Sequence, residues 1–212
     1  MVGGNQSRAV MVFVKNPEPG KVKTRLAADM GDERALSVYM CMADITITRA
    51  RTTDADMHIF FSSDIPSRWP FSGGSGAGIG AALHRQRGDD LGERMQNAFR
   101  DVFESGYERV VIVGSDCPEL TKRHLGDAFT ALDNHDVVIG PARDGGYYLL
   151  GMKSLHDELF VNKSWSTATV FHDTRRDARR LGLAVAELEV LSDVDTFDDF
   201  LRVRHLLDEK QC

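Results

Sequence analysis

Four consecutive apolar residues at positions 110–113 (Val-Val-Ile-Val) are the feature of this sequence that most constrains its fold. A β-branched run without polar alternation is typical of a strand buried on both faces, as in the middle of a parallel sheet. The run ends at Gly114, and Asp116 follows in a turn that contains Pro118. Because open α/β sheets bind ligands beyond the carboxyl ends of their strands, the sequence predicts an α/β fold with a ligand site near Asp116.

The carboxylate of Asp116 has two interpretations. Carboxylate oxygens are hard ligands that suit Mg2+ or Mn2+ carrying a phosphorylated molecule. The alternative is structural, because an aspartate here could cap the helix expected near Thr121 or form an Asx-turn. The segment by itself leaves both interpretations open.

Length and charge limit the classes of protein to consider. The 212 residues fit one domain spanning 1–212. The net charge of -6, from 26 basic and 32 acidic residues, argues against a nucleic-acid binder, which needs a basic surface. No signal-peptide pattern and no run of 18 apolar residues is present, so we expect a cytoplasmic protein without a membrane span. Cys117 lies beside Asp116, but no histidine base is paired with it locally, which disfavours a thiol nucleophile.

A basic loop follows the first predicted strand, at residues 9–14. Two prolines and Gly20 break regular structure in this loop, and its cations are Lys15, Lys21, Lys23 and Arg25. Charge runs are usually solvated surfaces. At the carboxyl end of a first strand, however, α/β proteins often bind phosphates, so we expect a phosphate-binding loop. The pattern matches neither Walker A nor GxGxxG.

Apolar periodicity predicts alternating strands and helices along the chain. Helices are expected at 32–51, up to about residue 104, at 121–132, around Val170 and after Thr196, where Ser166 or Thr167 would cap the fourth helix and Asp195 or Thr196 the last. Strands are expected at 56–61, 136–140, after Gly146 and at 184–191. The glycine-rich stretch 72–80 is interpreted as a surface loop, since no strand leads into it. Arg94, near the start of the second helix, could face the ligand cleft or water.

Two further acidic segments follow predicted strands. Asp144 precedes the glycine pair Gly145 and Gly146, which either brings the backbone close to a ligand or forms a tight hairpin. Asp193 and Asp195 follow the last strand, and only one residue is needed to cap the final helix. Asp193 is therefore free to reach a site at the same edge of the sheet.

Six segments together resemble one family. They are the stretches at 15–26 (KNPEPGKVKTRL), 90–95 (DLGERM), 114–120 (GSDCPEL), 140–151 (GPARDGGYYLLG), 165–167 (WST) and 193–196 (DVDT). In this order they look like the signatures of the DUF2064 family, a glycosyltransferase-A type group associated with radical-SAM and selenodomain proteins. The resemblance implies a nucleotide-diphospho-sugar transferase fold, with a mainly parallel sheet in a three-layer sandwich, and Mg2+ or Mn2+ as cofactor.

The resemblance also assigns roles to individual residues. It implies that Asp116, Asp193 and Asp195 bind the metal, that Asp116, Asp144 and Lys23 are catalytic, and that the nucleotide phosphates are bound by Lys15, Gly20, Lys23, Arg25, Arg94, Gly145 and Gly146. Asp144 and the two glycines after it would also face the acceptor, a small molecule. Two carboxylates on a metal that bridges phosphate oxygens would stabilise a departing diphosphate.

One departure from the pattern leaves the reaction open. Many sugar transferases of this fold have an Asp-x-Asp pair at the central strand, whereas this chain has Ser115, Asp116 and Cys117. The stretches at 23–26 and 193–196 also resemble the phospholactate guanylyltransferase type. We therefore expect a glycosyltransferase that uses a nucleotide-diphospho-sugar. The alternatives are a nucleotidyltransferase that couples an NTP to a phosphorylated small molecule and releases pyrophosphate, and a nucleotide-binding domain without turnover.

Overall fold

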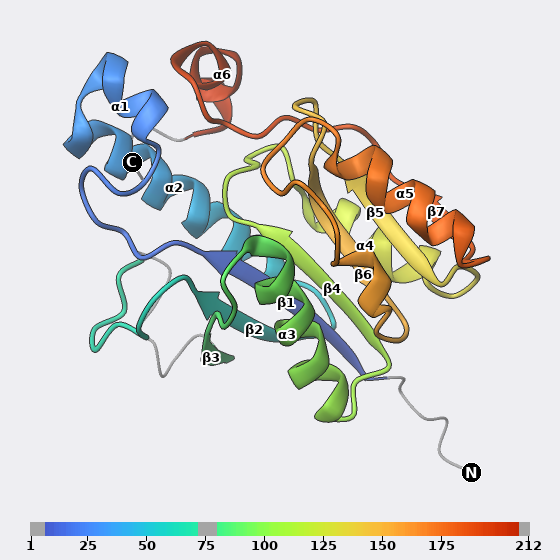
Figure 1. Cartoon of the computed structure of the whole chain (residues 1–212). Coiled ribbons are helices and arrows are strands. Elements are labelled where there is room, and N and C mark those ends of the chain that lie inside the picture. Colours follow the sequence, from blue (N-terminus) through green and yellow to red (C-terminus); the bar gives the residue numbers. More distant parts are fainter. Residues whose placement is uncertain (1–6, 72–79, 208–212) are drawn as a thin grey trace.

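The computed structural model describes residues 7–71 and 80–207, whose strands join into one sheet (Figure 1). The strands are β1 (Arg8–Val14), β2 (Asp56–Phe61), β3 (Ala81–Arg85), β4 (Arg109–Gly114), β5 (Val137–Pro141), β6 (Tyr147–Met152) and β7 (Val185–Glu187). Their order is β3-β2-β1-β4-β6-β5-β7. Only β6 runs antiparallel to its neighbours among these strands, so the sheet is mainly parallel, as predicted.

Helices cover both faces of this sheet (Figure 1). They are α1 (Thr24–Met30), α2 (Asp32–Arg51), α3 (Leu91–Glu104), α4 (Lys122–Ala131), α5 (Val170–Arg180) and α6 (Phe197–Val203), with 3-10 turns at Asp157–Leu159 and Arg204–Leu206. Helices α2 and α4 pack against one face, and α3 and α5 against the other. The predicted three-layer α/β sandwich is therefore confirmed. Among the described residues, no helix is both long and apolar enough to cross a membrane.

The central strand β4 is buried on both faces, as its unbroken apolar run predicted. Val111 and Val113 pack with α2 and α4, while Val110 and Ile112 pack with α3. All four are at most 4% exposed. This alternation fixes the register of β4, because a slip by one residue would exchange the two faces.

A third apolar cluster lies on the side of α2 that faces away from the sheet. Leu26 of α1, Val38 and Met42 of α2, and Val203 of α6 are buried together there, with Val194 from the preceding segment. Figure 1 accordingly shows α1 and α6 next to each other beyond α2. This packing places residues 193–195 beside the loop after β1.

The structure corrects several predicted boundaries. Strand β3 was not predicted, α1 begins at Thr24 within the stretch expected to be an irregular loop, and β7 is shorter than the predicted strand 184–191. The N-cap of α5 is Thr169, whose side chain makes no capping bond, and not Ser166 or Thr167. Residues 72–79 of the predicted glycine-rich loop lie outside the described residues.

The observed helix caps decide between the capping and the site interpretations of Asp116 and Asp195. The Thr121 side chain accepts from His124 N at the start of α4, and the Thr196 side chain accepts from Asp199 N at the start of α6. Asp116 is therefore not a helix cap. Of the two predicted caps of α6, Thr196 is the one observed, so the Asp195 side chain remains available to the site.

Candidate functional site

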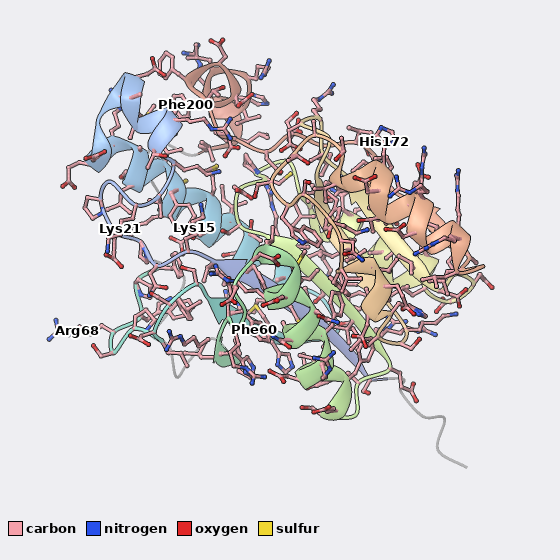
Figure 2. The ribbon with its side chains drawn as sticks, in the orientation of Figure 1. Lys15, Lys21, Phe60, Arg68, His172 and Phe200 are labelled. Carbon is pink, nitrogen blue, oxygen red and sulfur yellow. The ribbon has the colours of Figure 1, made fainter. Side chains whose placement is uncertain are left out.

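A cleft of about 670 Å3 opens at the carboxyl ends of β1 and β4. Its lining comes from the loop after β1, the loop before α3, the turn after β4, the turn before β6 and the segments at 165–170 and 193–195. Figure 2 shows two of its cationic side chains, Lys15 and Lys21, on the loop between β1 and α1. The cleft therefore lies where open α/β sheets bind ligands.

An ion-paired lysine lies at the centre of the acidic part of the cleft. Lys23 Nζ donates to Asp116 Oδ2 and to Asp195 Oδ1, each at 2.9 Å. The Lys23 side chain is only 6% exposed. Burial lowers the pKa of Lys23, but the charges and hydrogen bonds of Asp116 and Asp195 outweigh this effect and hold the pKa above its usual value. The two carboxylates therefore favour the charged form of Lys23.

The backbone of Lys23 explains how its side chain reaches this position. Lys23 adopts a left-handed conformation (φ 48°, ψ 45°) immediately before α1. A non-glycine residue rarely adopts this conformation unless its surroundings impose it. Here the two carboxylates hold the side chain, and α1 directs Arg25 to the second oxygen of Asp195 at 2.6 Å. The basic loop and the acidic segment 193–195 are therefore joined directly.

Asp193 has a different environment from Asp195. Its Oδ1 atom is buried and has no hydrogen-bond partner among the described residues. Burial, together with the charges of Asp116 and Asp144, raises the pKa of Asp193 well above its usual value. The backbone fixes this proximity, because Val194 N donates to Asp116 O at 3.0 Å. Lys23 has the opposite effect on Asp116, whose pKa it lowers despite burial.

The surroundings of Asp116, Asp193 and Asp195 show which of these acids fit a divalent cation. An orphaned buried carboxylate oxygen on Asp193 beside the carboxylate of Asp116 is the donor chemistry that Mg2+ or Mn2+ requires. Asp195 is instead ion-paired with Lys23 and Arg25. Among residues 7–71 and 80–207, no group of three His, Cys, Asp or Glu side chains is arranged as a metal site. The fit is therefore to a cation held by Asp116 and Asp193, with its remaining ligands from phosphate or water.

Asp144 lines the cleft from the turn between β5 and β6, with its charge close to Asp193. Its Oδ1 accepts from Gly146 N at 2.8 Å, which fixes the carboxylate at the cleft. Gly145 has φ 89°, and a Cβ there would lie 2.1 Å from Ala168 O. The glycine is thus required for packing against Ala168, and the hairpin between β5 and β6, one of the two alternatives that the sequence offered, is present.

The structure brings most of the predicted site residues together. Those that line the cleft are Lys15, Lys23, Arg25, Arg94, Asp116, Asp144, Gly146, Asp193 and Asp195. Gly20 and Gly145 are not part of this lining, so the geometry gives neither of them a phosphate contact. Arg94 is half-buried and donates from Nε to Gly88 O at 2.9 Å, which leaves its other nitrogens for the cleft.

Several cleft residues carried no assigned role in the sequence. Trp165 packs on Gly92, where a Cβ would lie 2.2 Å from the indole nitrogen, and Ser166 and Thr167 continue the lining. Tyr39 positions the loop after β1, since its hydroxyl donates to Lys15 O and accepts from Lys15 N. The Trp-Ser-Thr stretch was visible as part of the family resemblance, but no local pattern indicated that it reaches the cleft.

Two residues near Asp116 are structural. Cys117 is 1% exposed, and burial raises the pKa of its thiol, so it is unsuited to act as a nucleophile. Arg49 of α2 donates to Pro118 O and Leu120 O and so fixes the turn that carries Asp116.

Comparison with known proteins identifies the family. The model of DUF2064, described as "Uncharacterized protein conserved in bacteria", matches residues 46–167. The chain belongs to the DUF2064 family. This DUF2064 protein is also 37% identical to a solved structure, a candidate nucleotide-diphospho-sugar transferase from Desulfovibrio desulfuricans G20. That alignment covers 93% of this chain and 85% of the other, with a TM-score of 0.84.

More distant relatives share the fold or a part of the sequence. The DUF2064 protein is 36% identical over 61 residues to 2-phospho-L-lactate guanylyltransferase of Methanocaldococcus jannaschii, a match that spans only about a quarter of each chain (28% and 27%). Glucosyl-3-phosphoglycerate synthase of Mycobacterium tuberculosis, solved with Mn2+, UDP and glucosyl-3-phosphoglycerate, is 13% identical with a TM-score of 0.53, over 94% of this chain and 76% of that one. The fold is therefore that of nucleotidyl and sugar transferases.

Proposed function

We propose that this chain is a metal-dependent transferase that uses a nucleotide-activated donor, and that the donor is a nucleotide-diphospho-sugar. One observation carries the proposal: Asp116 and Asp193 lie side by side at the cleft, and the Asp193 Oδ1 atom is buried without a partner among the described residues. A buried carboxylate without a partner is unfavourable in the free protein, so it indicates a ligand. The 37% identity to the Desulfovibrio protein over 93% of this chain supports the sugar-nucleotide donor.

The cations of the cleft would bind the donor phosphates. Lys15 and Arg25 are exposed cleft side chains, and Lys23 adds a fixed charge between Asp116 and Asp195. A divalent cation held by Asp116 and Asp193 would neutralise charge on the diphosphate. Lys23 and Arg25 would stabilise the charge that develops on the leaving group, and their ion pairs hold them in place before the substrate arrives.

The acceptor would enter from the side of the cleft formed by Asp144, Tyr147 and Trp165. The Asp144 carboxylate keeps one oxygen available after accepting from Gly146 N, so it can accept a proton from an acceptor hydroxyl. The aromatic side chains of Tyr147 and Trp165 provide an apolar wall next to this carboxylate. Asp144 is thus our proposed general base.

Nucleotidyl transfer is the second candidate, and two observations favour it. A single carboxylate, Asp116, follows the central strand instead of an Asp-x-Asp pair. The local similarity to 2-phospho-L-lactate guanylyltransferase covers 61 residues at 36% identity. In this reaction a substrate phosphate would attack the α-phosphorus of an NTP, and pyrophosphate would leave.

The released product separates the two candidates. The protein is incubated with Mn2+ and panels of nucleotide-diphospho-sugars or NTPs, each with hydroxylated and phosphorylated small-molecule acceptors, and nucleoside diphosphate and pyrophosphate are measured. Release of nucleoside diphosphate supports glycosyl transfer, and release of pyrophosphate supports nucleotidyl transfer. Asp116→Asn should reduce turnover by at least about 100-fold, whereas Asp54→Asn, an exposed site before β2, should leave it unchanged. No metal-dependent release from either panel would reject the proposal.

A further inference from the structure

The carboxyl ends of β4, β1, β2 and β3 lie in a row along one edge of the sheet. Asp116 follows β4 at one end of this row, and the loop after β3 lies at the other end. The pairing register aligns Val14 of β1 with Phe61 of β2, and Phe61 with Arg85 of β3, while Phe13 pairs with Gly114 of β4. The loop that starts at Gln86 therefore lies three strand spacings from the turn of Asp116, or about 14 Å at roughly 4.8 Å per spacing. This is the span of an extended nucleotide, so phosphates near Asp116 would place the base at the loop after β3.

That loop, residues 86–90, is fixed along its whole length. Its contacts come from the neighbouring strands and from α3: Gln86 N to Phe61 O (2.8 Å), Gln86 Nε2 to Phe60 O (2.9 Å), Asn97 Nδ2 to Arg87 O (2.9 Å), Arg94 Nε to Gly88 O (2.9 Å) and Asp89 N to Glu93 Oε2 (2.9 Å). A segment held this way loses little conformational freedom on binding. The loop is therefore pre-organised for recognition.

Within this fixed loop, the carboxylate of Asp89 is free to bind a ligand. Asp89 lines the cleft, and its side chain makes no hydrogen bond or ion pair with the described residues. The neighbouring Asp90 is occupied, because its Oδ1 accepts from Glu93 N as the cap of α3. Leu91, which also lines the cleft, is 40% exposed and offers an apolar surface to a planar ring. The Asp89 carboxylate, which can bind the edge of a base, and the Leu91 side chain, which can pack on its face, thus line the same cleft.

A carboxylate accepts hydrogen bonds but cannot donate them, and this selects among the bases. Guanine presents two adjacent donors, N1–H and the N2 amino group, which match the two oxygens of a carboxylate. Adenine and cytosine present one amino group beside an acceptor nitrogen, and uracil presents one N–H between two carbonyl oxygens. These acceptors would repel the second carboxylate oxygen.

We propose that Asp89 selects a guanine nucleotide at this site, by accepting hydrogen bonds from N1–H and the N2 amino group of the base. The inference deepens the proposed function and rests on it, because it names the nucleotide for the same cleft. It applies to glycosyl and to nucleotidyl transfer alike, since it concerns only the base of the nucleotide.

Calorimetric titration with nucleoside diphosphates tests this assignment. Wild-type protein with Mn2+ should bind GDP about 10- to 100-fold more tightly than ADP, CDP or UDP, the usual range for paired hydrogen bonds to a charged group. Asp89→Asn should weaken GDP binding by a similar factor. The same variant should bind xanthosine diphosphate more tightly than wild type does, because an amide can accept from N1–H and donate to O2 of xanthine. Asp54→Asn should match wild type throughout.

The outcomes distinguish this inference from the proposed function. Equal binding of all bases by wild type, or unchanged GDP binding by Asp89→Asn, would overturn the role of Asp89 and leave nucleotide-dependent transfer standing. A uniform loss for every base in the variant would place Asp89 at the ribose and also overturn base selection. Binding of no nucleotide to wild type would reject both. Unchanged thermal stability of Asp89→Asn would show that the variant is folded.

Discussion

Lys23 holds together two acidic segments that are far apart in the sequence. Lys23→Met keeps much of the apolar stem but removes the charge between Asp116 and Asp195. Because both carboxylates are about one-third exposed, water screens part of their repulsion. We expect the free energy of unfolding to fall by about 1–3 kcal/mol, measured by urea denaturation.

Lys21→Met is the matched control for this variant. The Lys21 side chain is 72% exposed and, among the residues that the structure describes, pairs only with Glu18, three residues away. Removing such a surface pair should change the free energy of unfolding by no more than about 0.5 kcal/mol. If both lysine variants lose the same stability, the interpretation of Lys23 as a structural counter-ion is wrong.

The Asp193 carboxylate should lower the free energy of unfolding when no ligand is bound, because it is buried near other acids. Asp193→Asn keeps the shape but removes a buried charge close to Asp116 and Asp144. In EDTA we expect a free energy of unfolding about 1 kcal/mol higher than that of wild type. In Mn2+ with a nucleotide, the variant should gain less stability than wild type. Thermal denaturation in both buffers measures these two differences in stability. A variant less stable than wild type in EDTA would contradict the prediction.

Some of the site residues could be predicted because their positions follow from local sequence. Asp116, Asp144 and Asp193 each follow a predicted strand, and strand ends meet at one edge of a parallel sheet. The pairing of Asp195 with Lys23 and Arg25 could not be predicted, because it depends on how α6 packs against α1. The fixed loop around Asp89 could not be predicted either, because it is held by contacts with β2 and α3.

The pair of strands at the sheet edge, β2 and β3, carries a pH-sensitive contact. His58 Nδ1 lies 3.1 Å from His84 Nε2, and burial lowers the pKa of both rings below the usual 6.5. The unfolded chain then binds protons more readily than the folded one below pH 6.5. This contribution to stability is therefore complete above pH 6.5 and is lost as the pH falls further.

The expected loss is about 1 kcal/mol per pH unit for each proton taken up. It is measured by following the free energy of unfolding between pH 7.5 and pH 5. In His84→Gln the slope should be shallower than in wild type, since one titrating ring is gone and the other has lost its neighbour. Identical slopes would show that other groups cause the acid sensitivity.

The turn between β5 and β6 depends on a glycine. Gly145→Ala adds a Cβ 2.1 Å from Ala168 O at φ 89°, so segment 165–169 must move. We expect a loss of about 2–4 kcal/mol in unfolding free energy, together with weaker acceptor binding. Gly182→Ala is the control, since its φ is 74° with no atom within 4 Å of the added Cβ, and it should cost only about 1 kcal/mol. Equal losses of unfolding free energy in the two variants would contradict the packing role of Gly145.

At the level of elements, strongly periodic segments were predicted and weakly patterned ones were not. The helix at 32–51 and the strand at 56–61 have the predicted boundaries, because apolar spacing is clear over their full lengths. Strand β3 is a half-exposed edge strand whose residues show no clean alternation. Helix α1 lies close behind two prolines, and its N-cap residue Lys23 has a left-handed backbone that no local pattern indicated.

For the whole molecule, ligand binding should raise stability by linkage. A nucleotide at about 100 times its dissociation constant adds about 2.7 kcal/mol, or a shift of several degrees in Tm. Thermal denaturation should show this shift with Mn2+ and lose it on addition of EDTA. A shift that survives EDTA would mean that Lys15, Lys23 and Arg25 suffice to bind the nucleotide without metal.

The mainly parallel sandwich could be predicted from alternating strands and helices, but the place of β6 could not. Its sequence is apolar throughout, and such a strand fits between β4 and β5 in either direction. Only the short turn at 142–146 decides for an antiparallel neighbour of β5, and the insertion beside β4 follows from packing of the whole sheet.

The ion pair between Lys23 and Asp195 joins the two ends of the described chain across 172 positions. A ribosome synthesises this polypeptide from the amino end, so a nascent chain carries Lys23 and Arg25 long before Asp195, which pairs with both. A fragment that stops before residue 193 lacks two of the acids that line the cleft, Asp193 and Asp195. The ion pairs that join Lys23 and Arg25 to Asp195 can therefore form only after residue 195 has been synthesised, so this part of the cleft is completed late in folding.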